Sequence, residues 1–363
     1  NGAAVFTNND VKAAPILYSQ ELFLEDPGAK FHAVVANSGN ANACTGNQGL
    51  ADARKMAKET ARHLKIKPHE VLVCSTGRIG VKLPMSKITS GIRDASEDVL
   101  DGFDGSRAFQ KAILTSDTCT KSCSVLIETS YGEIAIGGVV KGAGMIQPDM
   151  ATMLAFITTD AVVENQFLKS VLTTAVNASF NLITIDGDMS TNDSVILLAN
   201  GNSGIKVSEE TKDLALSFKQ GVVTVCQSLA KKCVADGEKV TKFVSVKIEG
   251  AQNVQNADRI ARSIANSLLV KSSWFGNDPN WGRIVDAAGY AQIGLVFEKI
   301  DLFYDKTPVL LQGEPVISKK SQWKEIVTKN SFSIKLNLNL GDAKSEIWTN
   351  DLSEEYVNFN KSE

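Results

Sequence analysis

The sequence predicts a mixed α/β fold, on three observations. First, 363 residues exceed one ordinary domain, so we expect two packed α/β subdomains or one fold built from two similar halves. Second, 43% hydrophobic and 22% charged residues are typical of a globular protein with a large core. Third, β-prone runs alternate along the chain with segments whose apolar residues recur every three or four positions.

The first elements are a strand, a polar loop and a helix. Residues 31–36 form an apolar run that ends in residues 37–46, a loop rich in turn-forming residues. A helix is expected over residues 50–63, followed by a short strand over residues 71–74. The glycine turn after this strand offers backbone N–H groups, so Thr76 and Gly77 are candidate hydrogen-bond donors to a reacting group.

A helix and a β-hairpin come next. The pattern over residues 96–111 is helical, and residues 124–128 and 134–140 predict two strands around the turn Tyr131-Gly132. The second strand leads to Lys141 and a loop containing Gly142, Gly144 and Pro148. Another strand is expected over residues 153–163, so Thr152 stands where the loop becomes a strand.

The second half begins with a long helix over residues 208–235, because apolar residues recur there at helical spacing. Asp236-Gly237 ends it, and residues 244–248 alternate as a half-exposed strand. Glu238 therefore lies at a helix-to-strand junction. One further helix stripe is expected at Ile260, Ile264 and Leu268, then a turn-rich loop over residues 277–283 and a helix over residues 322–328.

Charge and hydropathy exclude several classes of protein. The formal charge is -3 and no concentrated basic run occurs, so nucleic acid is not an expected partner. No apolar segment approaches the roughly 20 residues that cross a bilayer, so no membrane association is expected. The first residues lack the basic region of a signal peptide, which predicts a cytoplasmic protein. Because residue 1 is Asn rather than Met, the sequence leaves open whether a presequence or another N-terminal segment precedes it.

The sequence gives no metal site. Only Cys119 and Cys123 of the six cysteines are close together, and the three histidines are far away in the sequence. Residues 186–193 place oxygen ligands at alternate positions, as a calcium loop does, but Thr191 and Leu197 occupy its required glycine and glutamate positions. This segment is better explained as a capped turn or a scaffold for a nearby site.

Thr152 is a candidate nucleophile. If the Ala151–Thr152 bond were cut, the threonine hydroxyl would gain an α-amine as its own base. An α-amine titrates near 8 and a lysine near 10.4, so at pH 7.5 about a quarter of the amine is neutral against roughly 0.1% of the lysine. A tetrahedral intermediate would also need donors for its oxyanion, which Thr76 and Gly77 provide.

Several motifs in the same order resemble those of the ornithine acetyltransferases, also called glutamate N-acetyltransferases, of arginine biosynthesis. The similar stretches begin with the Ala-Val-Phe-Thr segment near the N-terminus and reach Tyr356-Val357. Between them lie residues 37–46, 75–77, 141–160, 186–193 and 275–284. Several unrelated short motifs in one order are far more specific than any single one.

The resemblance implies a layered α/β/β/α-type sandwich of two subdomains and self-cleavage at Ala151–Thr152. An α chain (residues 1–151) and a β chain (residues 152–363) would then share one intertwined fold and assemble as an α2β2 heterotetramer. Thr152 would take acetyl from N-acetylornithine and pass it to glutamate. The resemblance implies no metal and no other cofactor.

By the same resemblance, individual residues acquire roles. Thr76 and Gly77 form the oxyanion hole, and the remaining site residues hold the substrate: Thr115, Lys141, Thr152, Glu238 and Asn360. A lysine suits a carboxylate and a glutamate suits an ammonium, so both charges fit an amino-acid substrate. Arg78 departs from the family, which usually has an apolar residue after the oxyanion pair.

Three questions stay open at this point. Acetyl-coenzyme A is a second candidate donor, because the family contains enzymes with and without its use. A self-processed N-terminal nucleophile amidohydrolase or aminopeptidase, in which water resolves the acyl-enzyme, is an alternative. A non-catalytic metal or small-molecule binding protein that uses residues 186–193 is a second alternative.

The chain also starts within the family's N-terminal region and stops short of a terminal Ser or Thr, which indicates an incomplete polypeptide.

Overall fold

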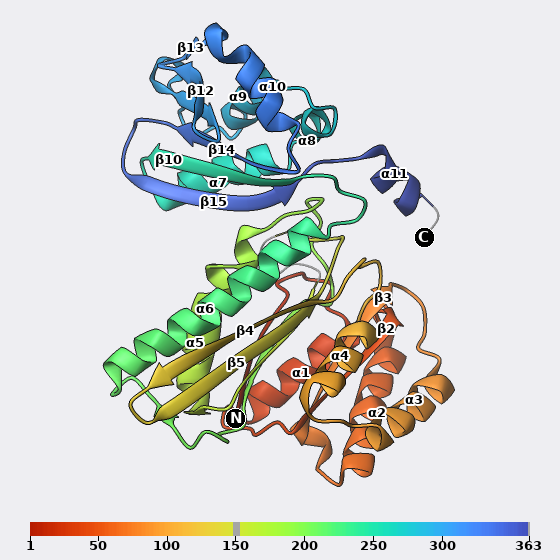
Figure 1. Ribbon diagram of the computed structural model, residues 1–363. Helices are drawn as coiled ribbons and strands as arrows, with labels where there is room; N and C mark the ends of the chain where they lie inside the picture. The colour runs from red at the N-terminus through yellow and green to blue at the C-terminus, as the bar shows by residue number, and fades with distance from the viewer. Residues whose placement is uncertain (148–152, 362–363) are drawn as a thin grey trace. The chain divides into compact units, whose positions relative to one another are not determined.

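The computed structural model describes residues 1–147 and 153–361. The chain divides into two compact units. Unit 1 comprises Asn1–Asn181 and Asp188–Cys233, and unit 2 comprises Leu182–Gly187 and Val234–Glu363. Both contain helices and sheets (Figure 1). The mixed α/β prediction is therefore confirmed.

Unit 1 is built on a five-stranded sheet in the order β1-β8-β6-β5-β4. β6 and β8 run parallel, and the other neighbours are antiparallel. Their bounds are β1 Gly2–Phe6, β4 Lys121–Thr129, β5 Gly132–Lys141, β6 Leu154–Thr159 and β8 Ser194–Ala199. β8 and β6, which follow residue 152 in the sequence, thus lie between β1 and β5, which precede it.

A second, smaller sheet in unit 1 pairs β2 (Ala33–Asn40) with β3 (Val71–Arg78) in parallel. Apolar residues of β3, such as Val71 and Leu72, share one core with Leu154 and Phe156 of β6. Helices α1 and α2 contribute to the same core. The bounds on this side are α1 Ala14–Glu25, α2 Gly46–Leu64, α3 Met85–Glu97 and α4 Gly102–Ala112.

The opposite face of the five-stranded sheet is covered by α5 (Asn165–Asn177) and α6 (Lys212–Ala235) (Figure 1). Gly138 of β5 approaches α6 so closely that a Cβ there would lie 2.7 Å from a methyl group of Val225. Unit 1 therefore has the layers helix, sheet, sheet, helix. A short pair, β7 (Val162–Val163) with β9 (Lys206–Val207), completes it.

Unit 2 has a six-stranded sheet in the order β13-β12-β11-β14-β10-β15. Its alternating apolar positions, such as Val244, Val246 and Ile248, pack against α7. Its strands are β10 Phe243–Ala251, β11 Asp301–Tyr304, β12 Thr307–Leu311, β13 Glu314–Pro315, β14 Ser331–Asn337 and β15 Ala343–Asn350. Its helices are α7 Val254–Ala265, α8 Leu268–Phe275, α9 Trp281–Gly289, α10 Lys320–Val327 and α11 Glu354–Asn360.

Several element predictions are confirmed and several are wrong. The hairpin is found as β4 and β5, and the helix expected at residues 50–63 is found as α2, longer at its start. The single helix over residues 96–111 is wrong, because α3 ends at Glu97 and α4 begins at Gly102. Leu268 opens α8 rather than extending α7, and the loop expected over residues 277–283 gives way to α9 at Trp281. α6 starts at Lys212, four residues later than expected.

Candidate functional site

The end of β3 carries the two candidate oxyanion donors. Thr76 is buried (5% exposed) opposite Ser38 of β2, and Gly77 lies opposite Gly39. Gly77 has φ +129°, a backbone conformation that favours glycine. A Cβ there would also lie 2.2 Å from the carbonyl carbon of Gly39. Both backbone geometry and space thus require glycine directly after Thr76.

The segment of residues 188–193 forms hydrogen bonds with the backbone at this end of β3. The Asn192 side-chain amide donates to the carbonyl oxygens of Ala41 (2.6 Å) and Ser75 (2.9 Å). The Thr191 hydroxyl donates to the Asn192 amide oxygen at 2.6 Å and so fixes the orientation of that amide. This arrangement agrees with the scaffold interpretation of the segment, because its polar side chains satisfy backbone groups beside Thr76.

Lys141, at the end of β5, brings three of the predicted site residues together. Its side chain is buried (3% exposed), and its Nζ donates to Oγ1 of Thr115 at 2.5 Å and of Thr76 at 3.3 Å. Burial lowers the pKa of Lys141, and the carboxylate of Asp117 opposes that effect only in part. The lysine therefore connects the strand end at Thr76 with the segment after α4.

Asp117 is a member of this cluster that the sequence did not single out. Its side chain is fully buried (0% exposed) and lies 3.6 Å from the Lys141 ammonium and 2.5 Å from the Lys121 ammonium. Burial alone would raise the pKa of Asp117, but the two lysines outweigh it and the pKa is lowered. A carboxylate four residues before Lys121, at the start of a strand, was the only signal in the sequence.

Asp193 is the second carboxyl group near the site, just before β8. Its Oδ1 accepts the backbone N–H of Met153 at 2.8 Å, and no hydrogen-bond partner for its Oδ2 is found among the described residues. Burial raises the pKa of Asp193 well above its usual value, which favours the protonated form of the carboxyl group. The sequence placed Asp193 in a turn and did not indicate this buried acid.

The predicted nucleophile and cleavage site, Thr152 and Ala151, lie outside the described residues. Their neighbours in the chain are described, because Lys141 of β5 pairs with Leu154 of β6 and Leu154 with Ser194 of β8. The ends of β5, β6 and β8 therefore meet at one edge of the sheet. Residue 152 is two positions before that edge in the sequence.

Glu238 and Asn360 belong to unit 2. The Asn360 side-chain amide donates to Oε2 of Glu238 at 3.1 Å, across a separation of 122 residues. Asn360 is exposed near the end of α11, and Glu238 is half-buried between α6 and β10. The structure thus brings these two predicted substrate residues together within their unit, as it brings Thr76, Thr115 and Lys141 together in unit 1.

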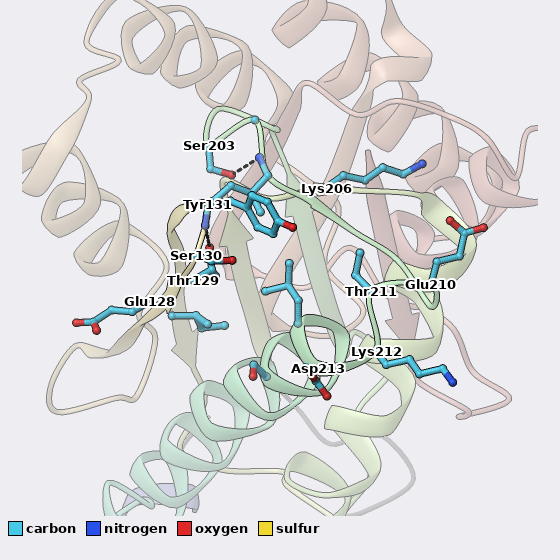
Figure 2. A pocket seen from close by; sticks show the side chains of 15 residues that line it. Glu128, Thr129, Ser130, Tyr131, Ser203, Lys206, Glu210, Thr211, Lys212 and Asp213 are labelled. Atoms are coloured by element: carbon cyan, nitrogen blue, oxygen red, sulfur yellow. Dashed lines mark hydrogen bonds between the residues drawn. The ribbon is translucent and has the colours of Figure 1, made fainter.

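A pocket of about 880 Å³ lies at the other end of the same sheet in unit 1 (Figure 2). Its lining includes Tyr131 at the hairpin turn and Ser203, and none of the predicted site residues. Lys141 lies nine residues further along β5 than Gly132, roughly 30 Å in an extended strand. Figure 2 shows the charged ends of Glu128, Lys206 and Lys212 directed away from its centre.

Other kinds of site were also considered. Among the described residues, no group of three or more His, Cys, Asp or Glu side chains could hold a metal ion. Arg78, the departure from the family pattern, is exposed. In the same described part of the chain, no helix is both long enough and apolar enough to cross a membrane.

Comparison with known proteins identifies the family. The model of the ArgJ family matches residues 1–362. The arginine biosynthesis bifunctional protein ArgJ of Dehalococcoides mccartyi is 43% identical over 359 residues, which cover 99% of this chain and 87% of that protein. Its counterpart from Geobacter sulfurreducens is 43% identical over 362 residues, with 99% and 90% covered.

A solved structure agrees with these matches. The crystal structure of the arginine biosynthesis bifunctional protein ArgJ from Bacillus halodurans has a TM-score of 0.55 and 35% identity, over 57% of this chain and 98% of that chain. The resemblance inferred from the sequence motifs is thereby confirmed. The chain belongs to the ArgJ family and is an enzyme of arginine biosynthesis.

Proposed function

We propose that this enzyme transfers an acetyl group from N-acetylornithine to glutamate through an acetyl ester on Thr152. The observation that carries the proposal is the Lys141 ammonium, which bridges the hydroxyls of Thr76 and Thr115. An ammonium group only donates hydrogen bonds, so both hydroxyl oxygens act as acceptors toward it. Their own protons stay available for a substrate.

The first half-reaction uses this arrangement. The Thr152 hydroxyl attacks the acetyl carbonyl carbon and gives its proton to the α-amine of Thr152. The Thr76 hydroxyl and the Gly77 N–H stabilise the tetrahedral oxyanion, and each such donor accounts for roughly 100- to 1,000-fold in rate. The carbon–nitrogen bond then breaks, the proton passes to the leaving nitrogen, and ornithine departs. Glutamate repeats these steps in reverse through its amine and leaves as N-acetylglutamate.

The substrate carries charges that match the site residues. In this proposal Lys141 binds the carboxylate of the amino acid and Glu238 binds the ornithine ammonium, with Asn360 beside Glu238. Support comes from the burial of Lys141, because a buried ammonium gains more from a carboxylate than an exposed one does. The protons and charges of these side chains suffice for acyl transfer, so the proposal includes no metal and no other cofactor.

Cleavage at Ala151–Thr152 prepares the nucleophile in this proposal. It yields an α chain of residues 1–151 and a β chain of residues 152–363. In the sheet order, β8 and β6 of the second fragment lie between β1 and β5 of the first, so each fragment completes the sheet of the other. We propose an α2β2 heterotetramer in the cytoplasm, which size-exclusion chromatography with light scattering and cell fractionation would test.

The decisive experiment combines mass and turnover. The purified protein should show two fragments by intact-mass measurement and should form N-acetylglutamate from N-acetylornithine and glutamate. Thr152→Ala should remain one chain and should transfer nothing. Normal turnover by that variant would remove Thr152 from the mechanism.

Two further arms of this assay separate the open alternatives. Acetyl-coenzyme A is offered in place of N-acetylornithine, because the relatives are named bifunctional; transfer from both donors would make this enzyme bifunctional too. Acetate release is measured with and without glutamate. Release from N-acetylornithine at a rate indifferent to glutamate would favour an amidohydrolase over a transferase.

A further inference from the structure

Asp117 joins three segments of unit 1 through one buried carboxylate. Its Oδ1 accepts from the Lys121 ammonium at 2.5 Å, at the start of β4, and from the backbone N–H of Gly142 at 2.6 Å, directly after β5. Its Oδ2 accepts from the backbone N–H of Thr115 at 3.2 Å and lies 3.6 Å from the Lys141 ammonium. Both oxygens are therefore used, and each contacts two different residues.

These contacts determine where Lys141 and Thr115 meet. Asp117 fixes the backbone of Thr115, whose hydroxyl accepts from Lys141 at 2.5 Å. It also fixes Gly142, the residue after Lys141 and the first of the loop that leads to Thr152. The lysine and its hydroxyl partner are thus both tied to one carboxylate, although they are 26 residues apart in the sequence.

The charge on Lys141 depends on the same carboxylate. Burial lowers the pKa of Lys141, and the like charge of Lys121 lowers it further, whereas Asp117 raises it. Cys233 also raises the pKa of Lys141, and Asp193 interacts with Lys141 but has its own pKa raised by burial, which favours its uncharged form. Among these groups Asp117 is the carboxylate that favours the charged ammonium.

We propose that Asp117 is a positioning residue that keeps Lys141 charged and aligned with Thr76 and Thr115, and so determines the preference for substrates with a free carboxylate. The inference rests on the proposed role of Lys141 in binding the substrate carboxylate. It extends that role, because the discrimination between a carboxylate and a neutral group would depend on a residue that does not touch the substrate.

Asp117→Asn tests this, because it keeps the shape of the side chain and removes the charge. We expect KM for N-acetylornithine and for glutamate to rise roughly 10- to 100-fold, with a smaller change in kcat. The pH above which KM rises should be lower than in the wild type, because Lys141 then loses its proton more easily. Discrimination between N-acetylornithine and its carboxamide, measured as the ratio of kcat/KM, should shrink by a similar factor.

Asp52→Asn is the matched control. Asp52 is also a buried carboxylate of unit 1, and it accepts from Gln48 rather than from a site residue. Its substitution should leave KM, its pH dependence and the discrimination ratio unchanged. Circular dichroism and the melting temperature of each variant report whether the fold is retained.

A double-mutant cycle with Lys141→Met separates positioning from a general structural role. If Asp117 acts through Lys141, Asp117→Asn adds nothing to the KM of the Lys141→Met variant. Additive effects, or a KM of Asp117→Asn within twofold of the wild type over the whole pH range, would overturn the inference. The double variant also removes the charges of both partners, so it keeps the comparison possible if the single variant folds poorly.

Calorimetric binding of ornithine distinguishes failure of this inference from failure of the proposed function. Weaker binding to Asp117→Asn than to the wild type and to Asp52→Asn supports the inference even in an enzyme that shows no acetyl transfer. Equal binding by all three proteins contradicts the inference even where the wild type catalyses the transfer.

Discussion

Gly77 lies directly opposite Gly39 in the parallel pair of β2 and β3, with no space for a side chain on Gly77. A Cβ on Gly77 would approach the backbone of Gly39 to 2.2 Å, whereas a Cβ on Gly39 would meet nothing within 4 Å. Both glycines have positive φ, +129° and +95°. They therefore differ in the space around them rather than in the need for an unusual backbone conformation.

This difference predicts the effect of Gly77→Ala. Backbone strain should cost about 1–3 kcal/mol at either glycine, and the collision with Gly39 should add a similar amount at Gly77 only. We expect Gly77→Ala to lose more stability than Gly39→Ala and to lose transfer activity, because the strand end that carries Thr76 must move. Urea unfolding and kcat of both variants check this, and equal losses would contradict it.

Glu238→Gln should affect the donor more than the acceptor. N-acetylornithine carries a side-chain ammonium that glutamate lacks, so the loss of the carboxylate should raise KM for N-acetylornithine roughly 10- to 100-fold. Steady-state kinetics with each substrate varied in turn measure this. Glu354→Gln, on the exposed start of α11, is the control. An equal rise in KM for both substrates would argue against an ammonium partner at Glu238.

Asp193→Asn should stabilise the protein at neutral pH. The folded protein holds a proton on Asp193 that the unfolded chain releases above about pH 4, so stability is lost as pH rises toward the raised pKa. The asparagine side chain does not titrate in this pH range, so the variant does not lose this stability as the pH rises. The difference in melting temperature between variant and wild type should therefore be more positive at pH 8 than at pH 4. A difference independent of pH would mean that Asp193 is ionised in the folded protein.

Lys271 should give the opposite pH dependence in unit 2. Burial lowers the pKa of Lys271 to about 7, and its ammonium donates to Oγ1 of Thr349 at 3.1 Å and Oδ1 of Asn350 at 2.9 Å. The unfolded chain keeps this proton up to about pH 10, so stability rises with pH between about 7 and 10.

Lys271→Met removes that contribution. From pH 7 to pH 9, the wild type should gain about 2 kcal/mol in free energy of unfolding relative to the variant. Urea titrations at the two pH values measure the change, with Lys324→Met on the exposed side of α10 as the control. A constant difference between wild type and Lys271→Met would show that the ammonium stays charged in the fold.

The elements that the sequence predicted correctly have strong local patterns. The hairpin of β4 and β5 combines β-prone runs with a glycine turn, and Gly132 there has φ +121°. α3 was missed because its residues are mostly polar, and Ile92 is its buried apolar residue. α9 was missed because the turn-forming residues before Trp281 and the glycines at both ends hide its stripe of Ile284, Ala287 and Ala288.

The site was only partly predictable. Thr76, Gly77, Thr115 and Lys141 were inferred from the family resemblance, and the fold places Thr76, Thr115 and Lys141 in mutual contact. Asp117 was not inferred, because its importance lies in burial beside two lysines. Neither the burial of Asp117 nor its contact with both lysines produces a local pattern in the sequence.

By itself, the sequence determined the family and the helices and strands with strong periodicity, and it led to the prediction of an N-terminal threonine nucleophile. Only the tertiary structure decided which polar groups meet: Lys141 with Thr115, Thr76 and Asp117, and Asp193 with the backbone of Met153. The physical reason is distance. Periodicity and turn preference act between near neighbours in the chain, whereas ion pairs, hydrogen bonds and burial act over a few ångströms between residues brought together by strand pairing.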